Sequence, residues 1–332
     1  MNRRTLLATM MIGATCMSAS NLGAAVPQER DATVTVSGVE IACRFTMPQG
    51  TPRGAVLLVP GSLYSDVDGN YPSMNMRPHA YADLAQQLGA HGFAVLRMAK
   101  IGPGTGSRTI DANAALRHID FLTRVEVAQA GLDLLRRTVT VRPVIVAGHS
   151  EGAVVASLLA AGLAAKSIDG VVSLSGPALP ILSIIRAQVA AMTPPGIVPD
   201  MTVFDRMVDA IRAGHPPSDD AKSNPQTAML ASLPEQGISY LRSADRIDPM
   251  AALAKVRQPV LIVQGGRDDS VPPSHADLLR ASRGNLSTEV TTFPNLTHFY
   301  KAQSARSCDF GHVEEQRLNM AIYQARSCPP IS

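Results

Sequence analysis

Residues 144–165 read VIVAGHSEGAVVASLLAAGLAA, and this stretch decides the fold. Residues 144–147 are continuously apolar, as in a strand buried on both faces of a sheet, and residues 153–165 are rich in alanine and leucine, as in a buried helix. Between them stands GHSEG at 148–152, a G-x-S-x-G pattern. A strand that turns directly into a helix through this pattern is typical of a nucleophile elbow. We therefore predict that Ser150 is a nucleophile; the alternative is a helix-capping serine without a catalytic role.

The two glycines of the pattern have a physical reason. A serine held at the tip of so tight a turn adopts a strained backbone, and Cβ atoms at Gly148 or Gly152 would crowd it. The helix that begins near Glu151 also directs unpaired N–H groups and the positive end of its dipole toward the turn. An anion that develops on a reacting carbonyl oxygen would be stabilised there.

The rest of the chain alternates between strand-like and helix-like segments. Helical patterns occupy residues 79–92 and 117–137, and residues 32–47 suggest two strands about a Ser-Gly turn. Mostly apolar strands are predicted at 54–62, 93–98, 143–148, 171–176, 259–266 and 287–294. Continuous apolar strands that alternate with helices indicate a doubly wound, mostly parallel sheet in an α/β domain. Residues 177–253 supply no strand and mix helical patterns with proline-rich breaks, so we predict a helical cap inserted between two sheet strands.

A nucleophilic serine needs a base, and the base needs an orienting acid. Downstream of the elbow, Asp268 lies in the turn after one apolar strand, and His298 follows the next strand. Carboxyl ends of strands in α/β sheets are where such sites assemble. We predict a Ser150–His298–Asp268 triad; the alternatives are Asp269 as the acid and His312 as the base.

This constellation resembles the α/β-hydrolase superfamily from about residue 55 to 325. The turn GGRDDSV at 265–271 is similar to the family's acid turn. LVPGSLYSDVDGN at 58–70 resembles the oxyanion loop of a bacterial esterase and serine-peptidase-like branch. The resemblance implies an α/β-hydrolase fold and an oxyanion hole formed by backbone N–H groups of Glu151 and of Ser62, with Leu63 as the alternative to Ser62.

The composition limits the partners. The formal net charge is +3, and Arg3 and Arg4 in the leader supply two of those charges, so nothing favours a nucleic acid or an anionic membrane. We expect a small-molecule ester substrate, no cofactor and no metal. The sequence makes no prediction of the oligomeric state.

The start MNRRTLLATMMIGATCMSASNLGAA is typical of a signal peptide. It predicts cleavage near Ala25, export to the periplasm or medium by the Sec or twin-arginine route, and no stable membrane span afterwards.

Four cysteines are present in the chain. In an oxidising compartment Cys308 and Cys328 can pair, or both can remain free thiols, and Cys43 would be a buried strand thiol.

We predict that the mature domain, 26–332, is a serine hydrolase that cleaves carboxylic esters of small or medium acyl groups through an acyl-enzyme. The alternatives are a peptidase of aminopeptidase or prolyl type, with cap residues Asp219 and Asp220 as candidate amine anchors, a thioesterase, or a non-catalytic binding protein on the same scaffold.

Overall fold

The computed structural model describes residues 26–162, 164–193, 196 and 198–302. The predicted signal peptide at 1–25, the alternative base His312 and the pair Cys308 and Cys328 lie outside the described residues and stay predictions. Cys43 is buried as expected, and burial raises the pKa of its thiol to about 12. Within the described part of the chain, no helix is both long and apolar enough to cross a membrane.

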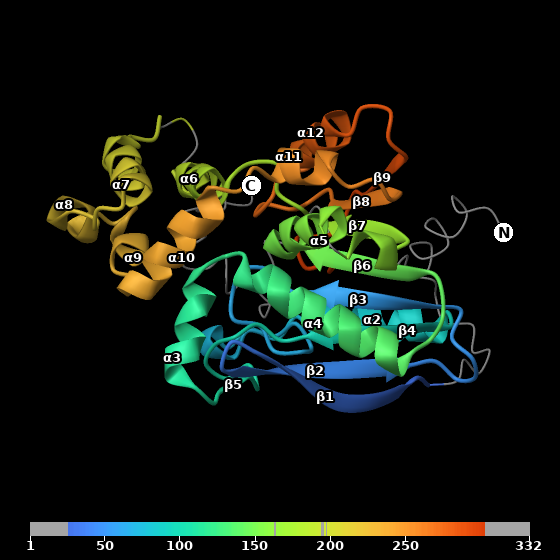
Figure 1. Ribbon diagram of the computed structural model, residues 1–332. Coiled ribbons are helices and arrows are strands. Elements are labelled where there is room, and N and C mark those ends of the chain that lie inside the picture. The colour runs from blue at the N-terminus through green and yellow to red at the C-terminus, as the bar shows by residue number, and fades with distance from the viewer. Residues whose placement is uncertain (1–25, 163, 194–195, 197, 303–332) are drawn as a thin grey trace, which may run out of the picture.

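One nine-stranded sheet organises the molecule, with strand order β1-β2-β4-β3-β6-β7-β8-β9 and β5 paired to β2 (Figure 1). The six strands from β4 to β9 in this order are parallel to one another. Strand β2 pairs antiparallel with β4, and β1 pairs antiparallel with β2. The strands are β1 (Gln28–Val36), β2 (Val39–Met47), β3 (Gly54–Val59), β4 (Phe93–Met98), β5 (Arg108–Thr109), β6 (Val144–His149), β7 (Gly170–Leu174), β8 (Val260–Gly265) and β9 (Thr288–Phe293). The predicted fold class, a doubly wound and mostly parallel α/β sheet, is confirmed.

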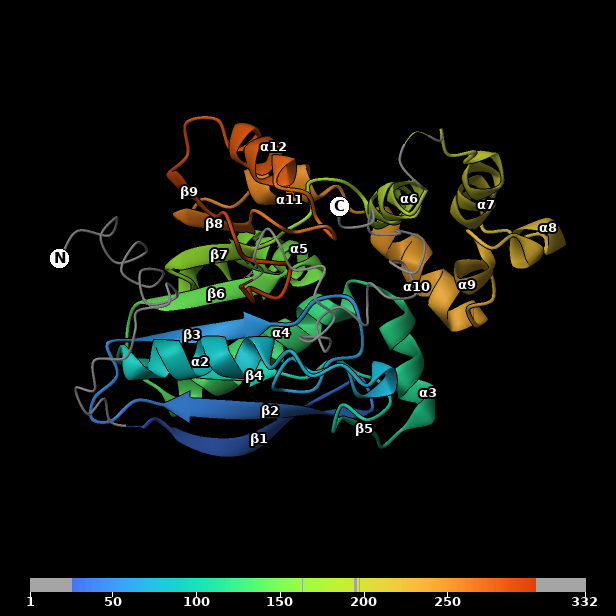
Figure 2. The same cartoon turned by 180° about the vertical axis from the view of Figure 1, so that it is seen from behind.

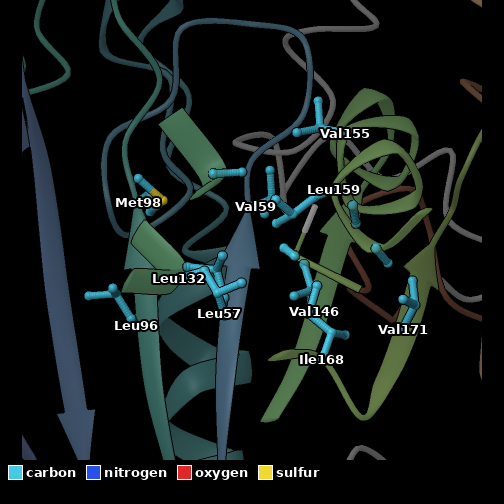
Figure 3. Packing of buried hydrophobic residues seen from close by; sticks show 14 of the residues in the cluster. Leu57, Val59, Leu96, Met98, Leu132, Val146, Val155, Leu159, Ile168 and Val171 are labelled. Carbon is cyan, nitrogen blue, oxygen red and sulfur yellow. The ribbon is translucent and has the colours of Figure 1, made fainter. Parts of the chain in front are cut away.

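The central strands are apolar throughout because both faces of the sheet are covered. Along β3, Leu57 and Val59 point into the core beneath helices α4 and α5, whereas Val56 and Leu58 pack with α2 on the other face. Figure 3 shows Leu57 and Val59 on the face that α4 and α5 cover. Helix α2 lies on the face seen in Figure 2. The helices that pack on the sheet are α2 (Ala80–Ala90), α4 (Thr123–Thr138), α5 (Glu151–Ala161), α11 (Pro249–Ala254) and α12 (Ser274–Ser282).

Five further helices stand beside the sheet with a hydrophobic core of their own. They are α6 (Ile181–Ala191), α7 (Thr202–Ala213), α8 (Asp219–Ser223), α9 (Ala228–Ala231) and α10 (Glu235–Asp245). In Figures 1 and 2 the parallel strands point their carboxyl ends toward this group, which we call the helical insertion. Helix α11 begins within 177–253 and ends at Ala254, but its Leu253 is buried in the core of the sheet domain.

The helix predicted at 117–137 differs at its start. Residues Leu116–Ile119 form a separate 3-10 turn after the short α3 (Ala112–Ala115), and the regular helix α4 begins only at Thr123. Asp120 breaks the helix with an extended backbone, and its carboxylate accepts hydrogen bonds from the Leu122 N–H and the Ser243 hydroxyl, both at 2.9 Å. Ser243 lies on α10, so the break is also a point where the helical insertion joins the sheet domain.

Candidate active site

Ser150 occupies a strained turn between β6 and α5. Its backbone has φ 53° and ψ −125°, a conformation that few residues other than glycine adopt. A Cβ at Gly148 would stand 2.1 Å from the Gly152 oxygen, and one at Gly152 would stand 2.4 Å from the Val59 oxygen. Both positions therefore exclude any side chain, as the sequence argument expects. The strand-turn-helix geometry is that of a nucleophile elbow.

Asp268 and His298 lie in contact. The His298 Nδ1 is 2.9 Å from Asp268 Oδ2 and 3.0 Å from Oδ1. The Asp268 side chain is wholly buried, and its carboxylate also accepts hydrogen bonds from the Val271 N–H at 2.8 Å, the Ser270 N–H at 3.0 Å and the Gln264 amide at 3.1 Å. Burial alone would raise the pKa of Asp268, but the adjacent His298 and these hydrogen bonds hold it below its ordinary value. The carboxylate is therefore charged and fixed against the imidazole.

His149, the residue before the serine, connects the elbow to the His298 loop. Its Nε2 lies 2.9 Å from the backbone oxygen of His298, and the two imidazole rings are 4.7 Å apart. A ring contact of this kind beside Ser150 brings the elbow and the Asp268–His298 pair to one place, at the carboxyl ends of β6, β8 and β9. The segments that carry Ser150, Asp268 and His298 therefore adjoin one another at this edge of the sheet, and the triad itself stays a prediction.

The tautomer of His149 follows from its partners. Burial lowers the pKa of His149 to about 3, with the nearby His298 acting in the same direction, so the ring is neutral. A carbonyl oxygen only accepts, so Nε2 carries the proton and Nδ1 accepts the Tyr81 hydroxyl at 3.0 Å. The Tyr81 oxygen in turn accepts the Gly61 N–H at 3.0 Å. One chain of hydrogen bonds thus runs from the loop after β3 to the His298 loop.

The loop after β3 lies directly against the elbow. A Cβ at Gly61 would stand 3.2 Å from the Ser150 Cβ. The next residue, Ser62, is one predicted oxyanion donor, and its side chain is among the groups that lower the pKa of Glu151. Glu151 is the first residue of α5, where backbone N–H groups have no partner within the helix. Both predicted donors therefore belong to segments that border Ser150.

The Glu151 side chain was not singled out from the sequence. It is 5% exposed and lies 3.0 Å from the guanidinium of Arg124 and 3.6 Å from the Lys100 ammonium, and it accepts a hydrogen bond from the Tyr240 hydroxyl. Burial alone would raise the pKa of Glu151, but Lys100 and Arg124 lower it to about 2. A glutamate after the serine was visible in the sequence, but its partners come from three distant segments and carry no local motif.

The two candidate amine anchors lie elsewhere. Asp219 is paired with Lys222, and Asp220 is paired with Arg206, all on the surface of the helical insertion. Their helix α8 stands at the end of the insertion that is farthest from α5 in Figures 1 and 2. The structure therefore does not bring them to Ser150.

Comparisons with known proteins agree with this architecture. The sequence profile of the serine aminopeptidase S33 family, Hydrolase_4, matches residues 73–300. No curated protein sequence is similar enough to register as a match.

Solved structures are similar at low identity. Est1E from Butyrivibrio proteoclasticus is 18% identical with a TM-score of 0.55, over 89% of this chain and 98% of that one. The complex of DcsB with its substrate analogue is 15% identical with a TM-score of 0.55, over 90% and 100%. The acylaminoacyl peptidase of Pyrococcus horikoshii is 12% identical with a TM-score of 0.51, over 100% and 45%. At such identities the likeness shows the fold alone.

Proposed function

Because the chain belongs to the serine aminopeptidase S33 family of α/β hydrolases, we propose that it hydrolyses carboxylic esters through Ser150, His298 and Asp268. The observation that carries the proposal is the buried contact of 2.9 Å between Asp268 and the Nδ1 of His298 beside a strained serine elbow. That contact assigns the proton of the neutral ring to Nδ1. Nε2 is then left as the acceptor that a general base requires.

The reaction takes two steps. His298 accepts the Ser150 proton at Nε2 while the serine oxygen attacks the ester carbonyl, and the charge of Asp268 stabilises the imidazolium that forms. Backbone N–H groups of Glu151 and Ser62 donate to the oxyanion of the tetrahedral intermediate, and each such donor lowers the barrier by about 3 kcal/mol. The alcohol leaves with the proton from His298, and the same histidine then activates the water that releases the acid.

Small or medium acyl groups are the proposed substrates. The helical insertion stands on the side to which the carboxyl ends of the strands point, where an insertion forms a lid or a pocket wall over the nucleophile. A wall built from an insertion with an apolar core favours small or medium acyl groups, and the proposed reaction uses no cofactor.

A substrate series tests the proposal. Wild type should hydrolyse p-nitrophenyl acetate and butyrate, and Ser150→Ala should lose on the order of 10⁶-fold in kcat. Ser157→Ala, at a buried serine on the helix that follows the elbow, is the matched control and should keep its activity. Undiminished hydrolysis by Ser150→Ala would sink the assignment.

The family description favours one second candidate, a serine peptidase, since peptidases use the same triad. Parallel assays with an aminoacyl p-nitroanilide and a short acyl thioester separate the three bond types. A kcat/KM for the anilide above that for the ester would replace the ester proposal with the peptidase one. Inactivity toward all three, with no labelling by a fluorophosphonate, would indicate a binding protein.

A further inference from the structure

A buried group of charges supports the loop after β3. Glu151, Lys100 and Arg124 have side chains that are 5%, 12% and 11% exposed, and they come from the starts of α5 and α4 and from the end of β4. Taking charged groups out of water is costly unless they are paired and hydrogen-bonded. The two basic side chains offset the buried charge of Glu151. They also donate hydrogen bonds to other groups, which indicate a second role.

Both cations donate to backbone oxygens of the loop. One guanidinium nitrogen of Arg124 lies 2.6 Å from the Pro60 oxygen and 3.2 Å from the Gly61 oxygen. The Lys100 ammonium donates to the Ser62 oxygen, the next carbonyl along the chain. Three successive carbonyls are therefore held by two buried basic side chains.

Because each peptide of this loop is planar and trans, a contact that holds a carbonyl oxygen also sets the direction of the next residue's N–H group. The C=O of one residue and the N–H of the next point in opposite directions across each planar peptide. The Gly61 N–H accordingly points away from Arg124, and it donates to Tyr81. By the same geometry, the N–H of Ser62 points away from Arg124, and that of Leu63 points away from Lys100. Ser62 is the predicted oxyanion donor of this loop, and Leu63 is the alternative to it.

Glu151 and Tyr240 connect this group to other parts of the molecule. Glu151 adjoins Ser150, so one carboxylate ties the cations to the elbow. Tyr240, on α10 of the helical insertion, donates its hydroxyl to Glu151, and its ring lies 5.0 Å from the Lys100 ammonium. A shift of α10 can therefore reach the loop through Tyr240, Glu151 and the two basic side chains.

We propose that Arg124 and Lys100 are positioning residues of the oxyanion hole. By holding the carbonyls of residues 60–62 they turn the Ser62 and Leu63 N–H groups toward the oxyanion, and Tyr240 couples this arrangement to the helical insertion. The inference rests on the proposed function but concerns residues outside the triad. An experiment can therefore contradict the inference and leave the proposed function intact.

The main test measures transition-state binding in Arg124→Gln. Steady-state hydrolysis of p-nitrophenyl butyrate should show kcat lowered on the order of 10²-fold with KM changed less than about threefold, the size of effect for one lost oxyanion donor. The inhibition constant of n-butylboronic acid, which forms a tetrahedral adduct with a catalytic serine, should rise by a similar factor. Arg136→Gln makes the same substitution at an exposed position of the same helix and should match wild type in both measurements.

Arg124→Lys separates charge from position. A lysine keeps a positive charge beside Glu151, but a single ammonium does not reproduce the planar fork that spans a carboxylate and two carbonyls. We expect thermal unfolding near that of wild type with kcat still lowered at least tenfold. A purely structural role predicts instead that recovery of stability restores kcat and boronic acid affinity together, and that result would overturn the inference.

Two milder variants keep the inference falsifiable if Arg124 variants do not fold. Lys100→Met should lower kcat at least tenfold, and Tyr240→Phe should lower it about threefold to tenfold, both with KM nearly unchanged. Wild-type kcat and boronic acid affinity in these folded variants would contradict the inference and leave the proposed function intact. A wild-type protein that neither hydrolyses esters nor binds the boronic acid would refute both.

Discussion

The acid arm of the site, Asp268 with His298, and the oxyanion arm, residues 60–63, are held by contacts of very different range. The carboxylate of Asp268 accepts hydrogen bonds from groups two, three and four residues away in the chain. The carbonyls of the oxyanion arm are held by Arg124, which is 64 residues beyond Pro60. Local contacts leave a motif in the sequence, whereas distant ones appear only when the chain is folded.

The largest expected effect breaks the acid arm. In Asp268→Asn the amide cannot fix the required tautomer of His298, and kcat should fall by about 10⁴-fold with little change in KM. The measurement is steady-state hydrolysis of p-nitrophenyl butyrate, with folding checked by circular dichroism. Asp269→Asn is the matched control one residue away and should stay within about threefold of wild type. The reverse ranking of the two variants would make Asp269 the acid.

The next effect breaks the packing between the elbow and the oxyanion arm. A Cβ in Gly152→Ala would meet the Val59 and Pro60 oxygens at 2.4 and 2.5 Å, so unfolding free energy should fall by more than about 3 kcal/mol. In Gly237→Ala, on α10 of the helical insertion, the new Cβ would meet its nearest neighbour, the Leu233 Cβ, at 3.4 Å, and the variant should gain up to about 1 kcal/mol from helix propensity. Urea unfolding of both variants measures this contrast. Equal stabilities would show that the elbow tolerates a side chain.

An acid titration tests the neutral state of His149, whose hydrogen bonds connect the oxyanion arm to the acid arm. Its pKa is about 3 in the folded protein, whereas an unfolded histidine titrates near 6.5. Between these pH values the unfolded chain binds a proton that the folded protein does not, so stability decreases as pH falls from 6.5 toward 3. The slope from this one group is about 1.4 kcal/mol per pH unit.

Unfolding of wild type and His149→Gln between pH 7 and 5 checks this expectation. In the variant, the slope of unfolding free energy against pH should be smaller by up to about 1.4 kcal/mol per pH unit, because glutamine does not titrate. An unchanged slope in His149→Gln would mean that the folded protein protonates the ring as readily as the unfolded chain does, and the protonated Nδ1 would then donate to the Tyr81 oxygen.

The smallest effect concerns the attachment of the helical insertion. The Ser243 hydroxyl donates to Asp120 and accepts the Phe121 N–H, both at 2.9 Å. Ser243→Ala removes two hydrogen bonds and should lower unfolding free energy by about 1 to 2 kcal/mol. Ser239→Ala, one turn earlier on α10, removes two bonds within that helix, one to Glu235 and one from Arg242, and should change stability by less than about 0.5 kcal/mol because neither bond joins α10 to the sheet domain. Equal effects would mean that Ser243 does not anchor the helix.

The sequence predicted most of the sheet and the acid arm for the same physical reason. Strands such as β3 are buried on both faces, so every residue from Ala55 to Val59 had to be apolar, and that run is readable without a structure. The elbow and the turn at Asp268 are equally local. Arg124 and Lys100 looked like ordinary charges, because nothing near them in the chain indicates burial.

The late start of α4 shows a second limit of sequence reasoning. The amphipathic pattern continues through 117–122, but Asp120 exchanges helical hydrogen bonds for one to Ser243, which is 123 residues away. Tertiary contacts overrode the local periodicity there. The same kind of contact carries the coupling that we infer for Tyr240, so the features missed from the sequence are concentrated where the helical insertion meets the sheet.

The most direct test of the account is to locate the site of covalent labelling. Intact and peptide mass spectrometry after treatment with a fluorophosphonate should show one adduct per chain, carried by the peptide that contains Ser150. The adduct should be absent in Ser150→Ala and should form far more slowly in His298→Ala, where no imidazole activates the hydroxyl. Labelling at another residue, or equal rates with and without His298, would contradict the claim that Ser150, His298 and Asp268 act as one unit.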